Sequence, residues 1–493
     1  MKFHRFKGGV HPEGNKTSTS EAIKTFPMPN RLIIPLLQHI GEPAKALVKT
    51  GQFVRKGELI AQGQGDFSAH IHAPTSGKII DIKPQQAPHP SGLPIECIVI
   101  ESDHKDQWVD LTPPPANPFS LTEKEIAQRV REAGIVGLGG ATFPSALKFN
   151  LALKQSVRTL VINGAECEPY LTSDDRLMQE RTEQVINGVR LMMLGVGASE
   201  AIIAIEDNKP LALKSMLTAA IDHADIKVLR VPTRYPMGSE KHLVYTVTGK
   251  EIPAGKFAAD IGVIVHNVGT TYAVYEAIFT GKPLVSRIVT VSGGAIKTPR
   301  NLEVPFGTLI SGLINYCGGF KQTPSRLLMG GPLMGMVMPD NNVPVIKGSN
   351  GIIALTESEL KLGRQSPCIR CSSCITACPC GLVPLEMAKN IRAGNFDRAV
   401  EYGVKDCISC GSCAYVCPSN IPLVHYFNYA KGELTARDKA KKQQAYTAEL
   451  AKQRQHRMEK IEAEKAAVRA KALAAKKARE AAKKAQQNQE AVN

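Results

Sequence analysis

Eight cysteines between residues 368 and 417 carry the strongest chemical signal in this 493-residue chain. They form two runs of one spacing, Cys368-Ile-Arg-Cys371-Ser-Ser-Cys374-Ile-Thr-Ala-Cys378-Pro379 and Cys407-Ile-Ser-Cys410-Gly-Ser-Cys413-Ala-Tyr-Val-Cys417-Pro418. Both match C-x2-C-x2-C-x3-C-P, the arrangement of bacterial ferredoxins that hold two clusters. The spacing therefore predicts two 4Fe–4S clusters and a role in electron transfer.

The fourth cysteine of each run is expected to ligate the cluster of the other run, as in two-cluster ferredoxins. A pair of zinc sites is the alternative, but zinc ligands usually come as two separated pairs rather than as a repeated quartet. Nothing at the start of the chain reads as an export signal, so metal ligation is favoured over disulfides. The predicted ligand sets are Cys368, Cys371, Cys374 and Cys417 for one cluster, and Cys407, Cys410, Cys413 and Cys378 for the other.

A glycine-rich turn offers a site for the electron donor. Residues 137–148 read Gly137-Leu-Gly139-Gly-Ala-Thr-Phe-Pro144-Ser-Ala-Leu-Lys148, a tight turn that runs into a predicted helix. Such a turn lets backbone N–H groups approach a phosphate, and Lys148 adds positive charge. A purely structural turn is an equally good interpretation of this segment alone, since it is neither G-x-G-x-x-G nor a Walker loop.

The next predicted strand ends in an acidic loop. Leu160-Val-Ile-Asn163-Gly-Ala-Glu166-Cys-Glu168-Pro169 places an amide and two carboxylates just past the strand. Ligands bind at this end of the strands in open α/β sheets. Carboxylates accept hydrogen bonds from ribose hydroxyls and repel a 2′-phosphate, so the loop favours NADH over NADPH.

Together the two loops resemble the flavin and NADH site of the flavoprotein subunit of respiratory complex I. That family has a Gly-rich loop ending in Phe-Pro-x-x-Leu-Lys, followed by Asn-x-x-Glu-x-Glu-Pro. Two later segments also match, Tyr235-Pro-Met-Gly238-Ser-Glu240 and His266-Asn267-Val-Gly-Thr270. The chain departs from the family where Thr142 replaces a Gly and His266 replaces an Asn.

The resemblance implies FMN as the cofactor and NADH as the substrate. It implies Glu168 as a contact of the nicotinamide nucleotide. No side chain is needed as an acid or base, so no catalytic residue is assigned. The implied FMN contacts are Gly137, Gly139, Lys148, Asn163, Glu166, Tyr235, Gly238, Asn267 and Thr270.

The elements that must position these residues predict a multidomain α/β and α+β protein. Residues 1–112 alternate short apolar runs with glycines and resemble a lipoyl-type barrel-sandwich, with Ser68-Ala-His-Ile-His72 where carriers have their modified lysine. Residues 119–284 alternate strand and helix patterns and predict an α/β domain that binds FMN and NADH. Its clearest elements are strands at 159–162 and 201–205 and a helix at 183–194.

The remaining parts follow in order. Residues 285–345 resemble an SLBB domain, a small β-grasp module. Residues 360–430 hold the cysteines, and a helix–turn–helix pattern between the two runs favours an α-helical two-cluster ferredoxin module. Residues 431–493 lack Pro and are rich in Ala, Lys, Glu and Gln, which predicts a helical or disordered tail.

Charge is concentrated in this tail. The whole chain carries +16, and the tail supplies +9 because it holds 17 Lys and Arg against 8 Asp and Glu. A solvated helix is the simpler interpretation, and an arm that binds an anionic partner is the alternative. No apolar run approaches the roughly 18 residues of a spanning helix, so we expect any membrane association to go through a partner or a surface.

The order of the modules, together with the start Phe6-Lys-Gly-Gly-Val-His-Pro12, resembles the C subunit of the Rnf ion-translocating electron-transport complex. That family implies a peripheral protein on the cytoplasmic side of the inner membrane, docked to integral and peripheral subunits. It implies electron exchange between NADH and a ferredoxin-like carrier, while the whole complex moves ions. Nucleic acid is not an expected partner.

Two alternatives stay open. One is an enzyme of the cobalamin reductase type, which resembles this family in its flavin and cluster modules. The other is a non-catalytic, cluster-bearing scaffold with a degenerate flavin site, for which Thr142 and His266 are the best support.

Overall fold

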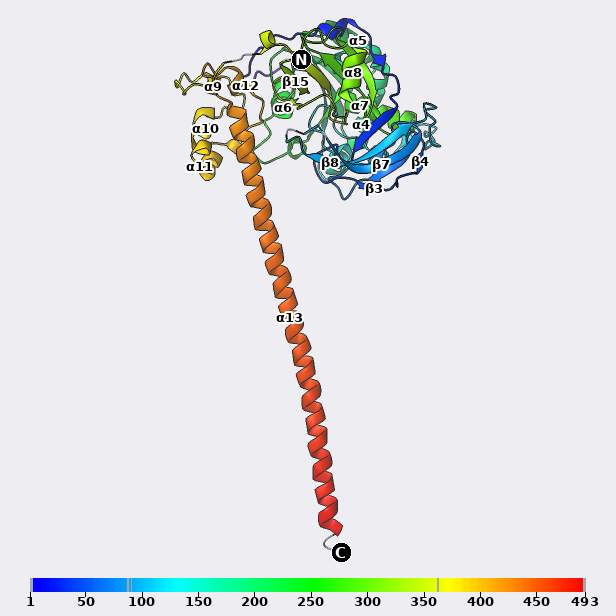
Figure 1. Cartoon of the computed structure of the whole chain (residues 1–493), viewed down its shortest axis with the longest axis vertical. Coiled ribbons are helices and arrows are strands. Elements are labelled where there is room, and N and C mark those ends of the chain that lie inside the picture. Colours follow the sequence, from blue (N-terminus) through cyan, green and yellow to red (C-terminus); the bar gives the residue numbers. More distant parts are fainter. Residues whose placement is uncertain (1–2, 87, 90, 361–362, 491–493) are drawn as a thin grey trace. The chain divides into compact units, whose positions relative to one another are not determined.

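The computed structural model describes residues 3–86, 88–89, 91–360 and 363–490. Residues at the outer ends of the predicted ranges 1–112 and 431–493, and residues 361–362 within 360–430, lie outside this part. The chain divides into two compact units, Met1–His425 and Tyr426–Asn493. The larger unit contains four sheets and the cysteine-rich segment, which confirms the predicted α/β and α+β class (Figure 1).

The first module is a barrel-sandwich of two small sheets. Their strands are rich in Ile and Val, which pack well on a pleated surface, and the core between them includes fully buried Leu32, Ile60 and Ile100. One sheet has the order β2-β8-β7-β4, with β2 (Arg31–Pro35), β8 (Pro94–Ser102), β7 (Gly77–Gln86) and β4 (Phe53–Val54). The other has the order β3-β5-β6, with β3 (Lys45–Ala46), β5 (Leu59–Gln62) and β6 (Ile71–His72).

The α/β domain is built on a parallel four-stranded sheet of order β11-β10-β9-β12. Its runs of Val and Ile are buried on both faces, as parallel strands require. The predicted strands and helix are confirmed, with slightly longer bounds for β9, β10 and α4. The elements are β9 (Thr159–Gly164), β10 (Glu200–Glu206), β11 (Ile226–Val231), β12 (Val263–Asn267), and helices α1 (Glu123–Glu132), α2 (Ser145–Ala152), α3 (Ser173–Glu180), α4 (Thr182–Val196), α5 (Pro210–Ala219), α6 (Glu240–Thr248) and α7 (Val268–Phe279), with short turns η2 (Pro118–Ser120) and η3 (Ala258–Ile261).

Helices cover both faces of this sheet. Leu160 and Ile203 join the large core that includes α1, α4 and α7, whereas Val161 and Ile202 face α6. The N-terminal segment joins the second face, where Phe6 packs edge-on against His242 with ring centroids 4.8 Å apart. The carboxyl ends of β9 and β12 therefore open at one edge, between two covered faces.

The sheet that contains the predicted SLBB-like range 285–345 also takes strands from outside this range. This six-stranded sheet has the order β1-β14-β13-β17-β15-β16, and two of its strands come from outside that range. One is β17 (Gly351–Leu355), and the other is β1 (Lys24–Thr25), which pairs in parallel with β14. The other elements are β13 (Ser286–Ser292), β14 (Arg300–Pro305), α8 (Ile310–Tyr316), β15 (Arg326–Met329) and β16 (Met336–Val337).

The cysteine-rich segment is helical, as predicted. Each run contains one short helix, and two further helices separate the runs. A turn at η1 (Thr17–Ser20) precedes β1, and η4 (Glu357–Glu359) leads toward the segment. Its elements are α9 (Ser373–Thr376), α10 (Pro384–Arg392), α11 (Phe396–Glu401), η5 (Val404–Asp406) and α12 (Ser412–Tyr415).

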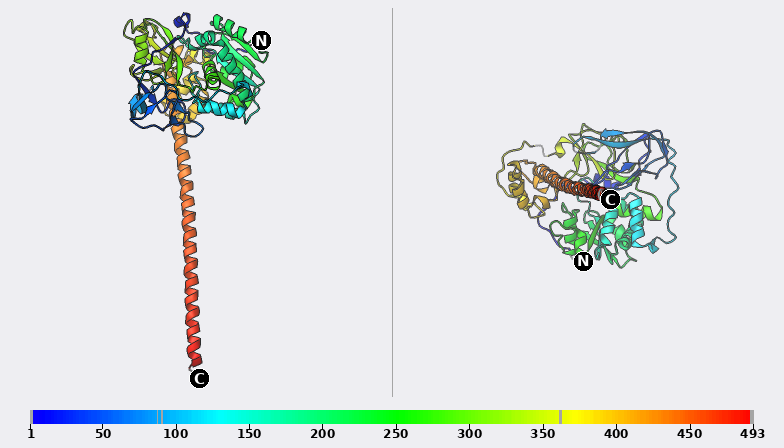
Figure 2. Two further views of the ribbon diagram at one scale, coloured as in Figure 1. Left: turned by 90° about the vertical axis from the view of Figure 1, so that its right-hand side faces the viewer. Right: turned by 90° about the horizontal axis from the view of Figure 1, so that it is seen from below.

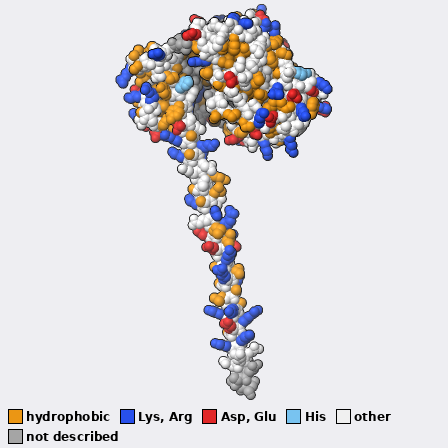
Figure 3. Space-filling view, viewed as in Figure 1, with side chains coloured by type: hydrophobic (Ala, Val, Ile, Leu, Met, Phe, Trp, Pro, Cys, Tyr) orange, Lys and Arg blue, Asp and Glu red, His pale blue; other side chains and the backbone are white. Residues whose placement is uncertain are grey.

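The basic tail is helical rather than disordered. α13 (Leu423–Glu490) is a single helix of 68 residues, uninterrupted in both views of Figure 2. Lys and Arg side chains project from it along its length (Figure 3). Among the described residues, no helix combines the length and apolar character needed to cross a bilayer.

The packing of α4 against α7 generates a stability prediction. A Cβ atom at Gly188 would overlap the carbonyl oxygen of Thr271, and helix backbone cannot yield easily. Gly188→Ala should therefore destabilise the chain by about 1–3 kcal/mol, as overpacking does, and lower the denaturation midpoint. Gly14→Ala is the control, because its Cβ would meet only the Lys16 side chain at 3.6 Å. Equal midpoints for the two variants would contradict the packing argument.

Candidate functional site

A cavity of about 570 Å³ opens at the carboxyl ends of β9 and β12. It is lined by the glycine-rich turn, the acidic loop, the segment around Tyr235 and the loop between β15 and β16 of the SLBB-like module. Nine of the ten predicted cofactor contacts lie on its wall. They are Gly137, Gly139, Lys148, Asn163, Glu166, Glu168, Tyr235, Gly238 and Asn267.

The tenth predicted contact, Thr270, does not line the cavity. It is fully buried in α7, and its hydroxyl accepts a hydrogen bond from the Leu138 N–H at 2.9 Å. Thr270 thereby holds the glycine-rich turn from behind. Within this turn Thr142 has φ +46°, a left-handed conformation that Gly adopts more readily than Thr. The backbone thus keeps the shape that suits the Gly of the related family.

The two glutamates of the acidic loop have different surroundings. The Glu166 carboxylate accepts bonds from Ser173 Oγ (3.1 Å) and the Asp174 N–H (3.0 Å) at the start of α3. The Glu168 carboxylate accepts from the N–H groups of Leu333 (3.0 Å) and Met334 (2.8 Å). Burial raises the pKa of Glu168 to about 7 despite these donors. Glu166 therefore caps a helix, while Glu168 joins two modules.

Lys16 anchors the acidic loop from outside the α/β domain. Its Nζ donates to the carbonyl oxygens of Glu166 (2.8 Å), Glu168 (2.8 Å) and Leu171 (2.6 Å). Burial lowers the pKa of Lys16. One ammonium therefore satisfies three backbone acceptors that the turn of the loop leaves without strand partners.

Two residues of the wall each carry a buried polar atom without a hydrogen-bond partner in the described chain. Ser145 Oγ and His266 Nε2 are buried and have no hydrogen-bond partner within the part of the chain that the structure describes. Burial, with Lys148 nearby, holds the pKa of His266 well below its usual value, so its ring is neutral. A ligand rich in hydrogen-bonding groups would satisfy both atoms, which fits a flavin better than an apolar guest.

The remaining predicted side chains are already engaged. Lys148 Nζ lies 2.9 Å from Glu240 Oε2 and donates to the Val265 carbonyl at 2.8 Å. Asn163 Nδ2 donates to the Gly238 carbonyl at 2.8 Å. At Gly238 a Cβ would approach the Ala165 carbonyl oxygen to 2.6 Å, so the two loops meet closely only because that residue is Gly.

The fourth cysteine of each run lies near cysteines of the other run. Burial raises the pKa of Cys374, and the nearby thiols Cys417 and Cys368 raise it further. Burial likewise raises the pKa of Cys413, with added effects from Cys410, Cys407 and Cys378. No three His, Cys, Asp or Glu side chains among the described residues are placed to share one metal ion. The assignment of these eight cysteines to two clusters stays a prediction from their spacing.

The second cysteine run shares a wall with the cavity. Tyr235 lines the cavity, and its hydroxyl donates to the Cys410 carbonyl at 2.6 Å. Ile408, between two cysteines of this run, also lines the cavity. Cys410 and Cys413 are buried, whereas Cys368 and Cys371 are exposed. The second run therefore lies next to the cavity, and the first two cysteines of the first run face solvent.

Family models match four consecutive parts of the chain. They are the RnfC barrel sandwich hybrid domain (residues 4–105), the Nuo51 FMN-binding domain (130–276), the SLBB domain (288–337) and the 4Fe-4S dicluster domain (367–421). The C subunit of the ion-translocating oxidoreductase complex of Rhodobacter capsulatus is 51% identical over 440 residues, 89% of this chain and 84% of that protein. The chain belongs to the RnfC family.

Two other relatives from the RnfC family agree. The C subunit of the proton-translocating ferredoxin:NAD(+) oxidoreductase complex of Clostridium ljungdahlii is 44% identical over 441 residues, 88% of this chain and 96% of that protein. The C subunit of the ion-translocating oxidoreductase complex of Pseudomonas aeruginosa is 42% identical over 472 residues, 94% of this chain and 60% of that protein. Family membership and the predicted modular architecture are thus confirmed.

The structure adds wall residues that the sequence analysis missed in this RnfC-family chain. Asp174 lines the cavity and accepts a bond from Asn267 Nδ2 at 2.6 Å, and its pKa rises to about 7 through burial, with Glu166 adding to the effect. Ser145 directly follows Pro144 at the end of the glycine-rich turn, so its place in the sequence already suggested that it lies near the site. Gly331 lies so close to Glu168 that a Cβ would overlap the carboxylate. The Gly330-Gly331 dipeptide is the feature of the sequence that could have indicated such a close approach.

The raised pKa of Glu168 predicts a pH effect on stability. Between the ordinary value of 4.5 and about 7, the unfolded chain ionises Glu168 more readily than the folded chain does. Unfolding is therefore favoured as pH rises through this window. Glu168→Gln removes the effect, so the melting temperature of the flavin-free variant minus that of the parent should increase from pH 5 to pH 7 and then level off. A difference independent of pH would contradict the raised pKa.

Proposed function

We propose that this RnfC-family protein exchanges electrons between NADH and a ferredoxin-like or membrane partner, through FMN and two 4Fe–4S clusters. The observation that carries the proposal is the shared wall, where Tyr235 and Ile408 line the cavity and also contact or belong to the second cysteine run. Bound FMN would supply hydride acceptance and release of single electrons. The chain supplies the binding, the orientation and the path.

The residues divide the work of holding the cofactor. The unpartnered Ser145 Oγ and the glycine-rich turn would hold polar groups of FMN, and Lys148 keeps positive charge beside them. Asn163, Glu166, Tyr235, Gly238 and Asn267 would complete the pocket, with Thr270 supporting the turn. Glu168 would contact the nicotinamide nucleotide, and its carboxylate disfavours a 2′-phosphate.

The burial of the cysteines supports an order for the two proposed clusters. The set Cys378, Cys407, Cys410 and Cys413 would hold the cluster next to the flavin. The set Cys368, Cys371, Cys374 and Cys417 would hold the outer cluster, because Cys368 and Cys371 are exposed where a partner can approach. Electrons would thus pass from the flavin to the inner cluster and then to the outer cluster.

The wider setting rests on the relatives. The name of the Clostridium ljungdahlii relative specifies ferredoxin and NAD(+) as its substrates and proton translocation by its complex. By analogy, this protein would dock peripherally on the cytoplasmic side of the inner membrane, on integral and peripheral subunits that move the ion. The relatives favour this setting over the cobalamin reductase alternative, and the shared wall favours electron transfer over a non-catalytic scaffold.

Cluster reduction by NADH tests the proposal. Purified protein loaded with FMN, iron and sulfide should bleach at the flavin and cluster absorption bands on addition of NADH, and far less with NADPH. Cys371→Ala should lose the outer cluster yet keep NADH-dependent reduction of the inner one. Cys410→Ala should stop electron flow at the flavin.

Cys317→Ala is the matched control for both variants. Cys317 is buried in the hydrophobic core, away from the two runs, so both clusters should remain. Electron paramagnetic resonance after NADH addition distinguishes the outcomes. Absence of any NADH-dependent reduction in the loaded parent protein would overturn the proposal, and inner-cluster loss in Cys371→Ala would overturn the order.

Lys16 generates a second prediction. Lys16→Met removes three bonds to the acidic loop and should weaken FMN binding about tenfold, equivalent to about 1.4 kcal/mol. Lys24→Met, an exposed position on β1, is the control and should bind FMN as the parent does. Recovery of FMN fluorescence on dilution measures both. Unchanged affinity in Lys16→Met would show that the loop holds its shape without the ammonium.

A further inference from the structure

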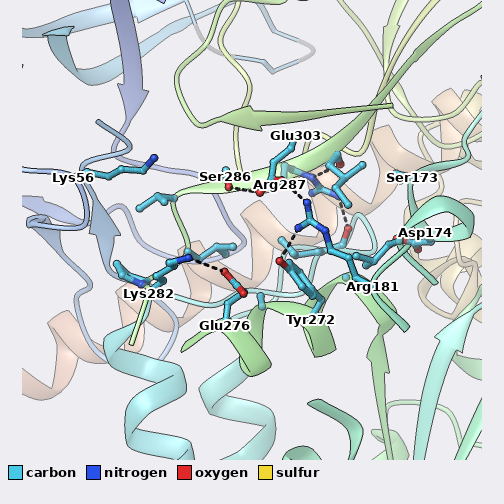
Figure 4. A pocket seen from close by; sticks show the side chains of 18 of the residues that line it. Lys56, Ser173, Asp174, Arg181, Tyr272, Glu276, Lys282, Ser286, Arg287 and Glu303 are labelled. Atoms are coloured by element: carbon cyan, nitrogen blue, oxygen red, sulfur yellow. Dashed lines mark hydrogen bonds and ion pairs between the residues drawn. The ribbon is translucent and has the colours of Figure 1, made fainter. Parts of the chain in front are cut away.

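A second cavity, of about 270 Å³, lies where the barrel-sandwich, the α/β domain and the SLBB-like module meet (Figure 4). Lys56 and Trp108 come from the first module, Tyr272 from α7, and Glu303 from β14. Ligand sites occur preferentially at such junctions. Nothing in the proposed electron path uses this cavity.

The lining of this second cavity includes a buried guanidinium. Arg287 is only 7% exposed, and it donates to the carbonyl oxygens of Leu138 (3.0 Å), Ile288 (3.3 Å) and Lys347. A guanidinium has five N–H donors, so two have no acceptor within the described chain. No carboxylate among the described residues lies within ion-pair distance of Arg287. Such a charge is costly to bury unless an anion compensates it.

Within the described residues, the only carboxylate with a marked influence on Arg287 is Asp174. Asp174 lines both cavities and is bonded to Asn267 on the flavin side. Because burial raises its pKa to about 7, Asp174 carries only part of a negative charge at neutral pH. It therefore leaves Arg287 partly uncompensated.

The rest of the lining divides into paired charges, cations on an aromatic ring, and apolar walls. Arg181 is paired with Glu303 at 2.5 Å and donates to Tyr272. Lys56 and Lys282 lie 5.0 and 5.9 Å from the centroid of the Trp108 ring. Lys56 is paired with Asp106 at 2.5 Å, whereas Lys282 is only loosely paired, 3.8 Å from Glu276. The apolar walls are formed by Leu177, Ala273, Pro283, Leu284, Val285 and Ile288.

We propose that this second cavity binds a small carboxylate with a compact apolar body. The carboxylate would pair with Arg287, since guanidinium and carboxylate form strong charge-assisted hydrogen bonds. The apolar body would pack against the α7 and β13 walls. The volume lies just below the roughly 300–1,000 Å³ of sites for drug-sized ligands, so a dinucleotide does not fit.

The chain carries its own reporter for this site. Trp108 is the only Trp among the 493 residues, and it lines the cavity. The full-length, cofactor-loaded protein is titrated at pH 7 with benzoate as the probe and with benzyl alcohol as its neutral counterpart. Benzoate should change Trp108 fluorescence saturably, at concentrations at least tenfold lower than benzyl alcohol requires. Equal or non-saturable responses would overturn the proposal.

Three variants distinguish this cavity from other binding modes. Ala273→Phe fills the space from α7 and should abolish the saturable change. Thr218→Phe adds the same ring to the exposed surface of α5 and should leave it unchanged. Lys282→Met, at a side chain that is 41% exposed, should weaken benzoate binding at least threefold without disturbing the fold. Parent-like binding in both Ala273→Phe and Lys282→Met would place benzoate elsewhere and overturn the proposal.

Discussion

The cavity at the carboxyl ends of β9 and β12 depends on one ammonium group, that of Lys16. The acidic loop turns away from the sheet after β9, and its carbonyl groups of Glu166, Glu168 and Leu171 point together at Lys16. Unpaired carbonyls in so buried a place would cost several kcal/mol, roughly 1–3 each. Lys16 belongs to the N-terminal segment. The wall of the cavity is therefore completed by a residue that lies far from the acidic loop in the sequence.

The same N-terminal segment ties the cysteine runs to the sheet. The Gly9 N–H donates to the Ala377 carbonyl at 2.9 Å, and Val10 pairs with Tyr235. Gly8 lies so close to the Cys378 carbonyl that no side chain fits there. Tyr235 then links to Cys410 from the other side. Cofactor cavity and cysteine module are therefore held by a common strap, which explains why a glycine pair stands at residues 8 and 9.

The sequence predicted the parts of the site that are local. Each cysteine run and the glycine-rich turn span only about twelve residues. Their chemistry could therefore be predicted before the fold was known. Thr270, Asp174 and Gly331 act through tertiary contacts with Leu138, Asn267 and Glu168. The sequence pointed to Thr270 and contains the Gly-Gly dipeptide, but it did not indicate the residues that they contact. The sequence analysis also did not assign β1 and β17 to the six-stranded sheet, because each pairs with a strand that is distant in the sequence.

The cysteines differ in exposure, so we expect them to differ in their susceptibility to oxidants. Sulfur at exposed positions such as Cys368 and Cys371 is attacked before sulfur shielded by packing, as at Cys410 and Cys413. Damage would begin at the solvent end and spare the inner set for longest. Under the proposed order of the clusters, a chain damaged in this way would still accept electrons at the flavin but would have no outlet for them.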